Sequence, residues 1–325
     1  ITDGESNAFF GMQAGYATTT GDNNTFLGFR AGDANTTASN NTAVGRDALG
    51  ATTTSGDNVA AGYLAMAVNT TGYGCTAVGA YALDANQTAN YNTAVGFSAL
   101  TTTTTGANNT AVGRIAGQDN STGAENVFIG EQAGYNNTTG SANTILGFRA
   151  GRGRTTGGSN VIIGSDASYS AGTGSNNVAV GVNAGYNWTS AYNNTCVGFN
   201  TRTDEYNSYG ATTIGYNGTG VGSEHITIVN GSNKTSVAIG STNWAGTSDQ
   251  RLKENIQSST AGLSFINDLR PVTFDWRMKK DIDTSLEAYE LNSEEKYHKF
   301  NPTNNHGFVA QEVKTALDNH SEVLA

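Results

Sequence analysis

Apolar and polar positions follow one another along most of this chain with a period of 17 residues. A glycine preceded by an apolar residue occurs thirteen times, from Gly11 to Gly215, and each lies 17 residues after the one before. The residue three before this repeat glycine is β-branched except at Ala8, and the residue four before it is asparagine except at Cys75 and Ala211. Each repeat therefore combines a short apolar stretch, a glycine and a longer polar segment.

This pattern predicts strands rather than helices. Glycine, asparagine and β-branched residues are poor helix formers, and the apolar positions show no 3.6-residue period. A strand of about five residues closed by glycine fits better. Because the 17-residue register never slips over residues 1–215, we expect each repeat to stack on the previous one as a rung of a parallel β-solenoid. The asparagines would then form a column in which each amide donates to one neighbour and accepts from the other.

The predicted strands are apolar on both faces. Residues one and three before the repeat glycine face one way and are apolar or β-branched, whereas the residue two before it faces the other way and is also mostly apolar. A strand that is apolar on both faces is buried on both. One face would fill the interior of the coil, and we expect the other to pack against another copy of the chain. The alternative is a monomeric solenoid whose long loops cover that second face.

The composition changes abruptly near residue 247. Forty of the 42 glycines precede this point, whereas both prolines and nine of the 17 Lys and Arg residues follow it. We therefore predict tandem β-roll repeats over 1–215, a transition or capping β segment over 216–247, and a small α+β domain over 248–325. The N-terminus lacks an initiator methionine and reads as a cut from a longer chain, and we expect the C-terminus to be truncated as well.

Charge and hydropathy argue against two classes of partner. The net charge of −10 argues against nucleic-acid binding, which needs clustered cations. Arg149, Arg152 and Arg154 come nearest to a cluster, and such a group is more typical of a solvated loop. No apolar run approaches the roughly 18 residues of a membrane span, so we expect no membrane insertion.

The sequence predicts neither a metal nor a cofactor. Its four histidines show no metal-binding spacing with the two cysteines. Cys75 and Cys196 would lie about seven rungs apart, on the order of 34 Å at ~4.8 Å per rung, which is far beyond the reach of a disulfide. We therefore expect two isolated thiols.

The repeat resembles the head repeats of trimeric autotransporter adhesins. The likeness rests on the theme N-[ST]-[VA]-x-[IV]-G-x-x-[SA], which recurs over residues 7–220 and includes three copies of the stretch NTAVG. Those heads are left-handed parallel β-rolls that associate as trimers, so the resemblance implies a trimeric β-roll. The unit here is longer than that of the adhesins, and we expect the extra residues in a threonine-rich outer loop.

The last region resembles the C-terminal intramolecular chaperone of phage tailspikes and tail fibres, the self-releasing trimerisation domain of endosialidases. Three ordered blocks carry the likeness: SDQRLKENI from Ser248, GLSFINDLRPVTFDW from Gly262, and HGFVAQEV from His306. They match the family patterns S-D-x-x-x-K, L-x-x-I-x-x-L-x-P-V-x-F-x-W and G-F-[IV]-A-Q-E-[VL]. The resemblance implies a domain that drives the formation of a homotrimer.

The same resemblance implies that the chain cleaves itself once, between Thr247 and Ser248. Ser248 would be the nucleophile, Lys253 the general base and Asp249 an orienting or capping residue. A lysine can act as a base only if its pKa falls toward 7. Because Ser248 lies on the leaving side of the bond, its hydroxyl would attack the Thr247 carbonyl through a five-membered ring, and water would open the ester. On spacing alone, an ordinary helix start capped by Ser248 or Asp249 is the better interpretation of this stretch, and it is the neighbouring sequence blocks that favour the catalytic one.

Together these features favour a trimeric tail fibre or tailspike shaft of a bacteriophage. Such a protein is an extracellular part of the virion and attaches to a host receptor, by analogy a surface glycan. Trp244, His225 and Trp188 are candidate receptor contacts, although the tryptophans could instead pack inside the cap. Three alternatives stay open: a bacterial surface adhesin, a glycan-degrading tailspike, and an ice-binding solenoid with columns of threonine.

Overall fold

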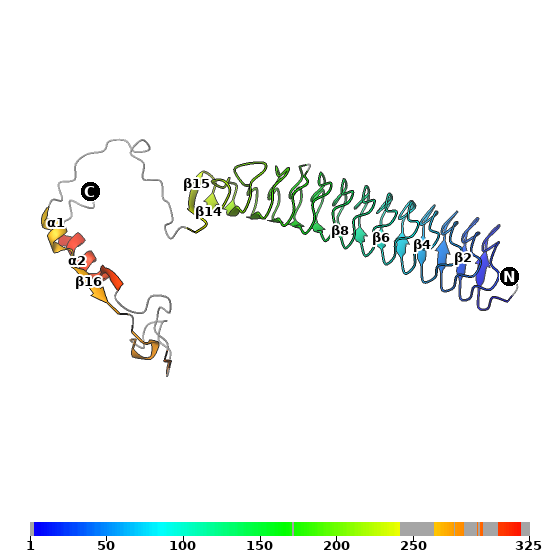
Figure 1. Cartoon of the computed structure of the whole chain (residues 1–325), viewed down its shortest axis with the longest axis horizontal. Coiled ribbons are helices and arrows are strands. Elements are labelled where there is room, and N and C mark those ends of the chain that lie inside the picture. Colours follow the sequence, from blue (N-terminus) through cyan, green and yellow to red (C-terminus); the bar gives the residue numbers. More distant parts are fainter. Residues whose placement is uncertain are drawn as a thin grey trace. The chain divides into compact units, whose positions relative to one another are not determined.

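The chain forms two compact units, Ile1–Gly246 and Thr247–Ala325. In Figure 1 the first unit is a row of stacked rungs, and the second carries short helices and strands. The structure is a computed structural model, and it describes residues 3–170, 172–240, 263–275, 277–282, 291, 293–294 and 305–319.

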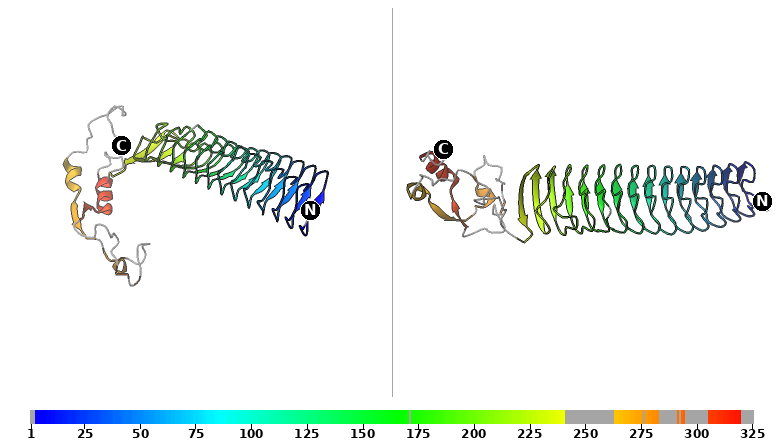
Figure 2. Two further views of the ribbon diagram at one scale, coloured as in Figure 1. Left: turned by 45° about the vertical axis from the view of Figure 1, so that its right-hand side comes forward. Right: turned by 90° about the horizontal axis from the view of Figure 1, so that it is seen from above.

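The first unit is a parallel β-solenoid. Its strands β1 to β13 lie side by side in sequence order, and each pairs with the next at an offset of 17 residues, from Ala8↔Thr25 to Thr195↔Thr212. Figure 2 shows the resulting ladder of rungs from two further sides. The prediction of a mainly β fold built from 17-residue rungs is confirmed. The strands are β1 (Ala8–Phe10), β2 (Thr25–Leu27), β3 (Thr42–Val44), β4 (Val59–Ala61), β5 (Thr76–Val78), β6 (Thr93–Val95), β7 (Thr110–Val112), β8 (Val127–Ile129), β9 (Thr144–Leu146), β10 (Val161–Ile163), β11 (Val178–Val180), β12 (Thr195–Val197) and β13 (Thr212–Tyr216).

Most strands are three residues long rather than the five expected. Just before most strands, an asparagine side chain takes the place of a backbone carbonyl as the hydrogen-bond acceptor. For example, the Asn41 backbone N–H donates to Asn24 Oδ1 at 3.0 Å. At the end, the repeat glycine turns the chain out of the strand. Gly113 has a φ of 137°, and a Cβ there would lie 2.6 Å from the carbonyl oxygen of Gly130. The period of 17 therefore depends on a residue without a side chain at this position.

Buried asparagines form two columns along the solenoid. In the predicted column, Asn126 Nδ2 donates to Asn109 Oδ1 at 3.1 Å and to the Gly140 carbonyl at 2.8 Å, while its own Oδ1 accepts the Asn143 N–H at 3.0 Å. Each amide is thus saturated by the rungs on either side, as a buried polar group must be. A second column, which was not predicted from the sequence, lies seven residues after the repeat glycine and contains Asn35, Asn69, Asn86, Asn120 and Asn137.

The interior is filled by the residue two before the repeat glycine and the residue four after it. In many rungs these two positions complement each other in volume, because a large residue at one meets a small residue at the other. The pairs include Phe26 with Gly32, Ala43 with Leu49, Ala77 with Leu83, and Phe128 with Gly134. A Cβ at Gly32 would lie 2.6 Å from the Phe26 ring. Where both positions are small, as at Ala111 and Gly117, Leu100 and Phe128 of the neighbouring rungs fill the space, so close packing is shared between rungs.

The expectation of a solvated loop around three arginines is wrong. Arg149 forms an ion pair with Asp166, with Nε and Oδ1 2.8 Å apart. Arg152 lies over the rings of Tyr135 and Tyr169. Arg154 is buried in the position of the second asparagine column, where it donates to the Gly174 carbonyl and to Ser168 Oγ. Burial lowers the pKa of its guanidinium to about 10, so it remains a cation at neutral pH.

The two cysteines are free and buried, as predicted. Burial raises the pKa of both thiols, that of Cys196 to about 12. Neither is therefore a reactive thiolate at neutral pH.

Threonine columns follow the second asparagine column. Thr36 Oγ1 donates to the Thr53 carbonyl of the next rung at 2.9 Å, and Thr138 Oγ1 to the Thr155 carbonyl at 3.1 Å. The hydroxyl groups of the first threonine column thus donate hydrogen bonds to backbone carbonyls of the next rung. A second column, one residue further along, is exposed.

An antiparallel hairpin follows the last rung. Strand β14 (His225–Asn230) pairs in parallel with β13, but at an offset of 14 residues, with Thr212 opposite Ile226. Strand β15 (Asn233–Ala238) then pairs antiparallel with β14. The chain has reversed its direction at this edge, so the parallel stacking of 17-residue rungs ends here. We call β14 and β15 the cap hairpin.

The second unit contains short elements of both kinds. They are α1 (Leu263–Asp268), β16 (Pro271–Phe274), the single 3-10 turn η2 (Lys279–Asp281), β17 (Asn305–Phe308) and α2 (Ala310–Asn319). Strands β16 and β17 form an antiparallel pair with Pro271 opposite Phe308.

One prediction concerns the single cysteine in the first asparagine column. Cys75 Sγ faces the Ala89 carbonyl at 3.4 Å and the Asn92 N–H at 3.5 Å, where an asparagine would form two shorter bonds. The substitution Cys75→Asn should therefore raise the free energy of unfolding by about 1 kcal/mol. The matched change Asn126→Cys should lower it by a similar amount. Guanidinium unfolding midpoints of both variants measure the effect, and equal midpoints would contradict it.

A second prediction concerns the volume match inside a rung. Gly32→Leu should destabilise the solenoid by about 1–3 kcal/mol, because the new side chain collides with Phe26. Phe26→Ala should cost about 3–5 kcal/mol through the cavity it leaves. The double variant recreates the Ala43 and Leu49 combination of the next rung, so most of the loss should be recovered. Strictly additive losses in a double-mutant cycle would show that the two positions do not share one space.

Candidate functional site

The residues predicted to cleave the chain lie outside the described residues. This holds for Thr247, Ser248, Asp249 and Lys253, and also for the candidate receptor contact Trp244. Their roles therefore stay predictions that rest on the sequence.

The C-terminal unit brings the second and third sequence blocks together. Strand β16 belongs to the second block and β17 to the third, and their backbones pair over four residues, from Pro271↔Phe308 to Phe274↔Asn305. The two blocks are thus separate in the chain but adjacent in the sheet. A short helix precedes β16 and a longer one follows β17 almost directly.

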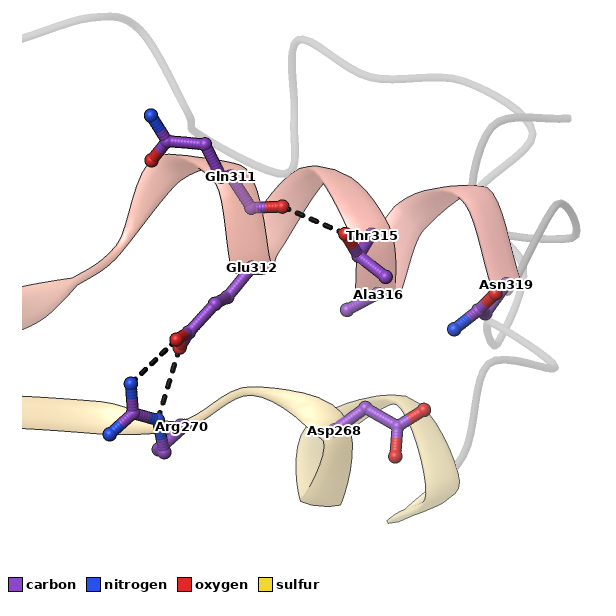
Figure 3. A pocket seen from close by; sticks show the side chains of 7 residues that line it. All are labelled: Asp268, Arg270, Gln311, Glu312, Thr315, Ala316 and Asn319. Atoms are coloured by element: carbon purple, nitrogen blue, oxygen red, sulfur yellow. Dashed lines mark hydrogen bonds and ion pairs between the residues drawn. The ribbon is translucent and has the colours of Figure 1, made fainter.

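A salt bridge joins the same two blocks on the surface of this unit. Arg270, just before β16, donates from Nε to Glu312 Oε2 at 3.1 Å and from Nη2 to Oε1 at 2.5 Å. Figure 3 shows this bidentate contact at one end of a shallow pocket between the α1–β16 segment and α2, with Ala316 and Asn319 further along the helix. The hydrogen-bonded guanidinium holds the pKa of the Glu312 carboxyl below its ordinary value. Because both side chains are exposed, the pair orients the two segments more than it stabilises them.

The described part of the C-terminal unit leaves apolar side chains uncovered. Phe308 and Val309, at the junction of β17 and α2, are 53% and 37% exposed, whereas Ala316 is buried. An isolated two-stranded sheet is marginally stable in water unless further strands or a partner cover it. These exposed apolar groups are available to pack against another surface.

A second apolar surface runs along the solenoid. It consists of the residues one and three before each repeat glycine, and we call it the outer strand face. Strand β2 shows the pattern: Phe26 is buried in the coil while its neighbours Thr25 and Leu27 are exposed. The side chains one before the glycine are Phe10, Leu27, Val44, Ala61, Val78, Val95, Val112, Ile129, Leu146, Ile163, Val180, Val197 and Ile214.

The outer strand face combines an apolar column, one residue before each repeat glycine, with a mostly threonine column three residues before it, and the chain covers the apolar column only in part. Val112, Ile129 and Leu146, in successive rungs, are 37%, 37% and 40% exposed. A continuous column of this length far exceeds the scattered apolar residues of an ordinary surface. This second apolar face agrees with the alternation of residues along each predicted strand. The loops of the same chain do not cover it fully.

The two remaining candidate receptor contacts have different environments. Trp188 is fully buried, and its indole N–H donates to Thr203 Oγ1 at 2.8 Å, so it packs in the core and offers no surface to a receptor. His225 begins β14 and is half-buried, with Nδ1 2.8 Å from the Ser223 carbonyl. It lies at the base of the cap hairpin.

The described residues contain no group of three or more His, Cys, Asp and Glu side chains that could hold a metal ion. Among them, no helix is both long enough and apolar enough to span a bilayer.

Comparison with known families identifies the C-terminal region. Residues 248–322 match the family model described as chaperone of endosialidase, which confirms the resemblance carried by the three sequence blocks. Neither the curated proteins nor the solved structures contain a significant match to the chain. The chain thus joins a β-solenoid of 17-residue rungs to a chaperone-of-endosialidase region, a combination that matches an endosialidase-type tail fibre with a C-terminal chaperone.

Proposed function

We propose that this chain forms a trimeric fibre of a phage virion, which attaches the particle to its host. The outer strand face carries this proposal, because its residues one before each repeat glycine form an unbroken apolar column that the chain covers only in part. Two further copies of the chain could cover it if the three columns packed around a common axis. Obligate interfaces of this kind resemble a protein core cut in half.

A trimer of identical rungs has a register problem. The outer column is made of nearly equivalent Val, Ile and Leu residues, so a shift by one rung would leave almost every apolar contact in place. Hydrophobic patterning alone therefore specifies the stagger of the three chains weakly. A separate nucleus that trimerises first would set the stagger before the rungs zip together.

The C-terminal unit is suited to be that nucleus. It matches a chaperone family, and the exposed Phe308 and Val309 supply apolar surface for contacts with neighbouring copies. Once the solenoid is assembled, this unit has no further role, and its removal would make unfolding kinetically irreversible.

We propose that removal occurs by a single cleavage between Thr247 and Ser248. Lys253 accepts the hydroxyl proton of Ser248, whose Oγ attacks the Thr247 carbonyl carbon. The C–N bond breaks, the amine of Ser248 takes up the proton, and an ester joins the two residues. Water then hydrolyses the ester and leaves a carboxylate on Thr247. Asp249 orients the nucleophile or caps the segment that follows it.

After cleavage, the cap hairpin would lie near the free end of the fibre. His225 and Trp244 are candidate contacts with the host receptor there, and a surface glycan is the proposed ligand class.

The trimer can be tested by placing charges on the outer strand face. The double variant Val112→Glu and Ile129→Glu should prevent trimer formation, because burying two unpaired carboxylates per chain costs several kcal/mol. The matched control is Thr122→Glu, in the exposed threonine column, which should remain trimeric. Light scattering measures the mass of each particle. A monomeric, folded unmutated chain would refute the trimer.

Self-cleavage can be tested independently by mass spectrometry. The unmutated chain should lose residues 248–325, whereas Ser248→Ala and Lys253→Met should stay intact, since each lacks one partner of the proposed dyad. All three proteins should be trimeric by light scattering. Intact unmutated protein would exclude the catalytic role of Ser248 without affecting the proposed fibre.

A further inference from the structure

Two pockets adjoin each other on the solenoid next to the cap hairpin. The first, of roughly 400 Å³, is lined by Arg149, Asp166, Asn183, Tyr186, Asn200 and Arg202. The second, of roughly 340 Å³, is lined by Arg202, Asn217, Gly218, Thr219, Gly231, Ser232 and Lys234. They share Arg202, and a hydrogen bond of 2.5 Å from Asn200 Nδ2 to Asn217 Oδ1 joins their rims. We call this continuous surface the cap groove.

The cap groove contains two cations that no carboxylate neutralises within the described residues. Arg202 uses Nε to donate to Thr219 Oγ1 at 2.9 Å, which leaves the rest of its guanidinium free, and Lys234 on β15 is exposed. Arg30 and Arg114 differ, since Arg30 pairs with Asp33 and Arg114 with Glu131. In a chain with a net charge of −10, two unpaired cations around one groove form a local exception.

The acidic residue in the groove does not neutralise them. Asp166 already accepts from the Arg149 guanidinium, with Arg149 Nη2 and Asp166 Oδ2 2.9 Å apart. This pair fixes one wall of the groove as a neutral unit. The positive charge of Arg202 and Lys234 is therefore available to a ligand.

The other wall offers a flat aromatic ring and amides. Tyr186 is 41% exposed and its ring stacks on Tyr169, with the centroids 5.3 Å apart and the planes at 5°. Tyr169 is itself covered by Arg149 and Arg152, so the platform is rigid. Asn183 provides an amide beside it. A rigid exposed ring flanked by amides is suited to the apolar face and the hydroxyls of a sugar ring.

We propose that the cap groove binds an acidic polysaccharide. A sugar ring stacks on Tyr186 and hydrogen-bonds to Asn183, while carboxylate or sulfate groups of the chain pair with Arg202 and Lys234. Nucleic acid is a poorer fit because its phosphate backbone needs a longer run of clustered cations than the two that the groove provides. The groove residues do not belong to the outer strand face. This inference names the ligand class of the proposed attachment function and rests on it.

The test measures binding of the full chain to immobilised dextran sulfate, to alginate and to neutral dextran. Both anionic polymers should bind and neutral dextran should not. Arg202→Gln and Lys234→Gln should each weaken binding about threefold, and the double variant about tenfold, as expected for partly exposed charge pairs. Tyr186→Ala should weaken binding further, whereas Tyr186→Phe should retain it because the ring is preserved.

The matched control is Arg114→Gln, which removes an exposed arginine five rungs away from Arg202. It should bind as tightly as the unmutated chain. Equal weakening by this control would show general attraction rather than a site and would overturn the proposal. So would unchanged binding by the double variant, equal binding of neutral dextran, or complete displacement of the polymer by millimolar sodium sulfate at constant ionic strength, which would indicate a site for a single anion.

Light scattering and mass spectrometry on the same samples keep this test separate from the proposed fibre. A monomeric unmutated chain would contradict the proposed fibre, and an uncleaved one would contradict only the proposed role of Ser248. If the unmutated protein is trimeric and cleaved but does not bind the anionic polymers, only the proposal for the cap groove is contradicted.

Discussion

Hydrogen bonding between rungs at a fixed offset of 17 residues is the constraint on which the solenoid depends. Backbone amides, the first asparagine column and the first threonine column all direct their donors along the long axis, from one rung to the next. The repeat glycine allows this spacing because its carbonyl approaches the glycine of the neighbouring rung more closely than any Cβ would permit. Proline, which lacks the N–H, is accordingly absent from the first 270 residues.

This constraint leaves one side of every strand without a partner. The coil is thin, so a three-residue strand can direct only its central side chain inward, and the flanking Thr, Val, Ile and Leu residues face out. Each rung is therefore hydrogen-bonded to its neighbours along the axis, but the apolar column of the outer strand face is covered only in part. The proposed trimer completes it, and the near-identity of the rungs explains why a separate C-terminal unit would be needed to align three copies.

Departures from the repeat indicate where the chain acquires individual features. Arg154 and Trp188 replace residues of the second asparagine column. Both are buried in the core, where Arg154 donates a hydrogen bond to Ser168 and Trp188 donates one to Thr203. Arg202 replaces an interior glycine or leucine position, yet its side chain is exposed. It lies between two pockets beside the cap hairpin, where the regular rungs end and where a distinct binding surface can form.

The sequence by itself determined the strand positions, the 17-residue register, the first asparagine column, the isolated cysteines and the family of the C-terminal region, because each follows from strict periodicity or from ordered motifs. It did not reveal the length of the strands, the second asparagine column, the burial of Arg154 and Trp188, or the cap groove. These depend on which side chains meet across the interior and between neighbouring rungs. Two residues such as Arg202 and Lys234, 32 positions apart, become neighbours only when β14 and β15 fold back against the last rung, so only the tertiary structure could bring them together.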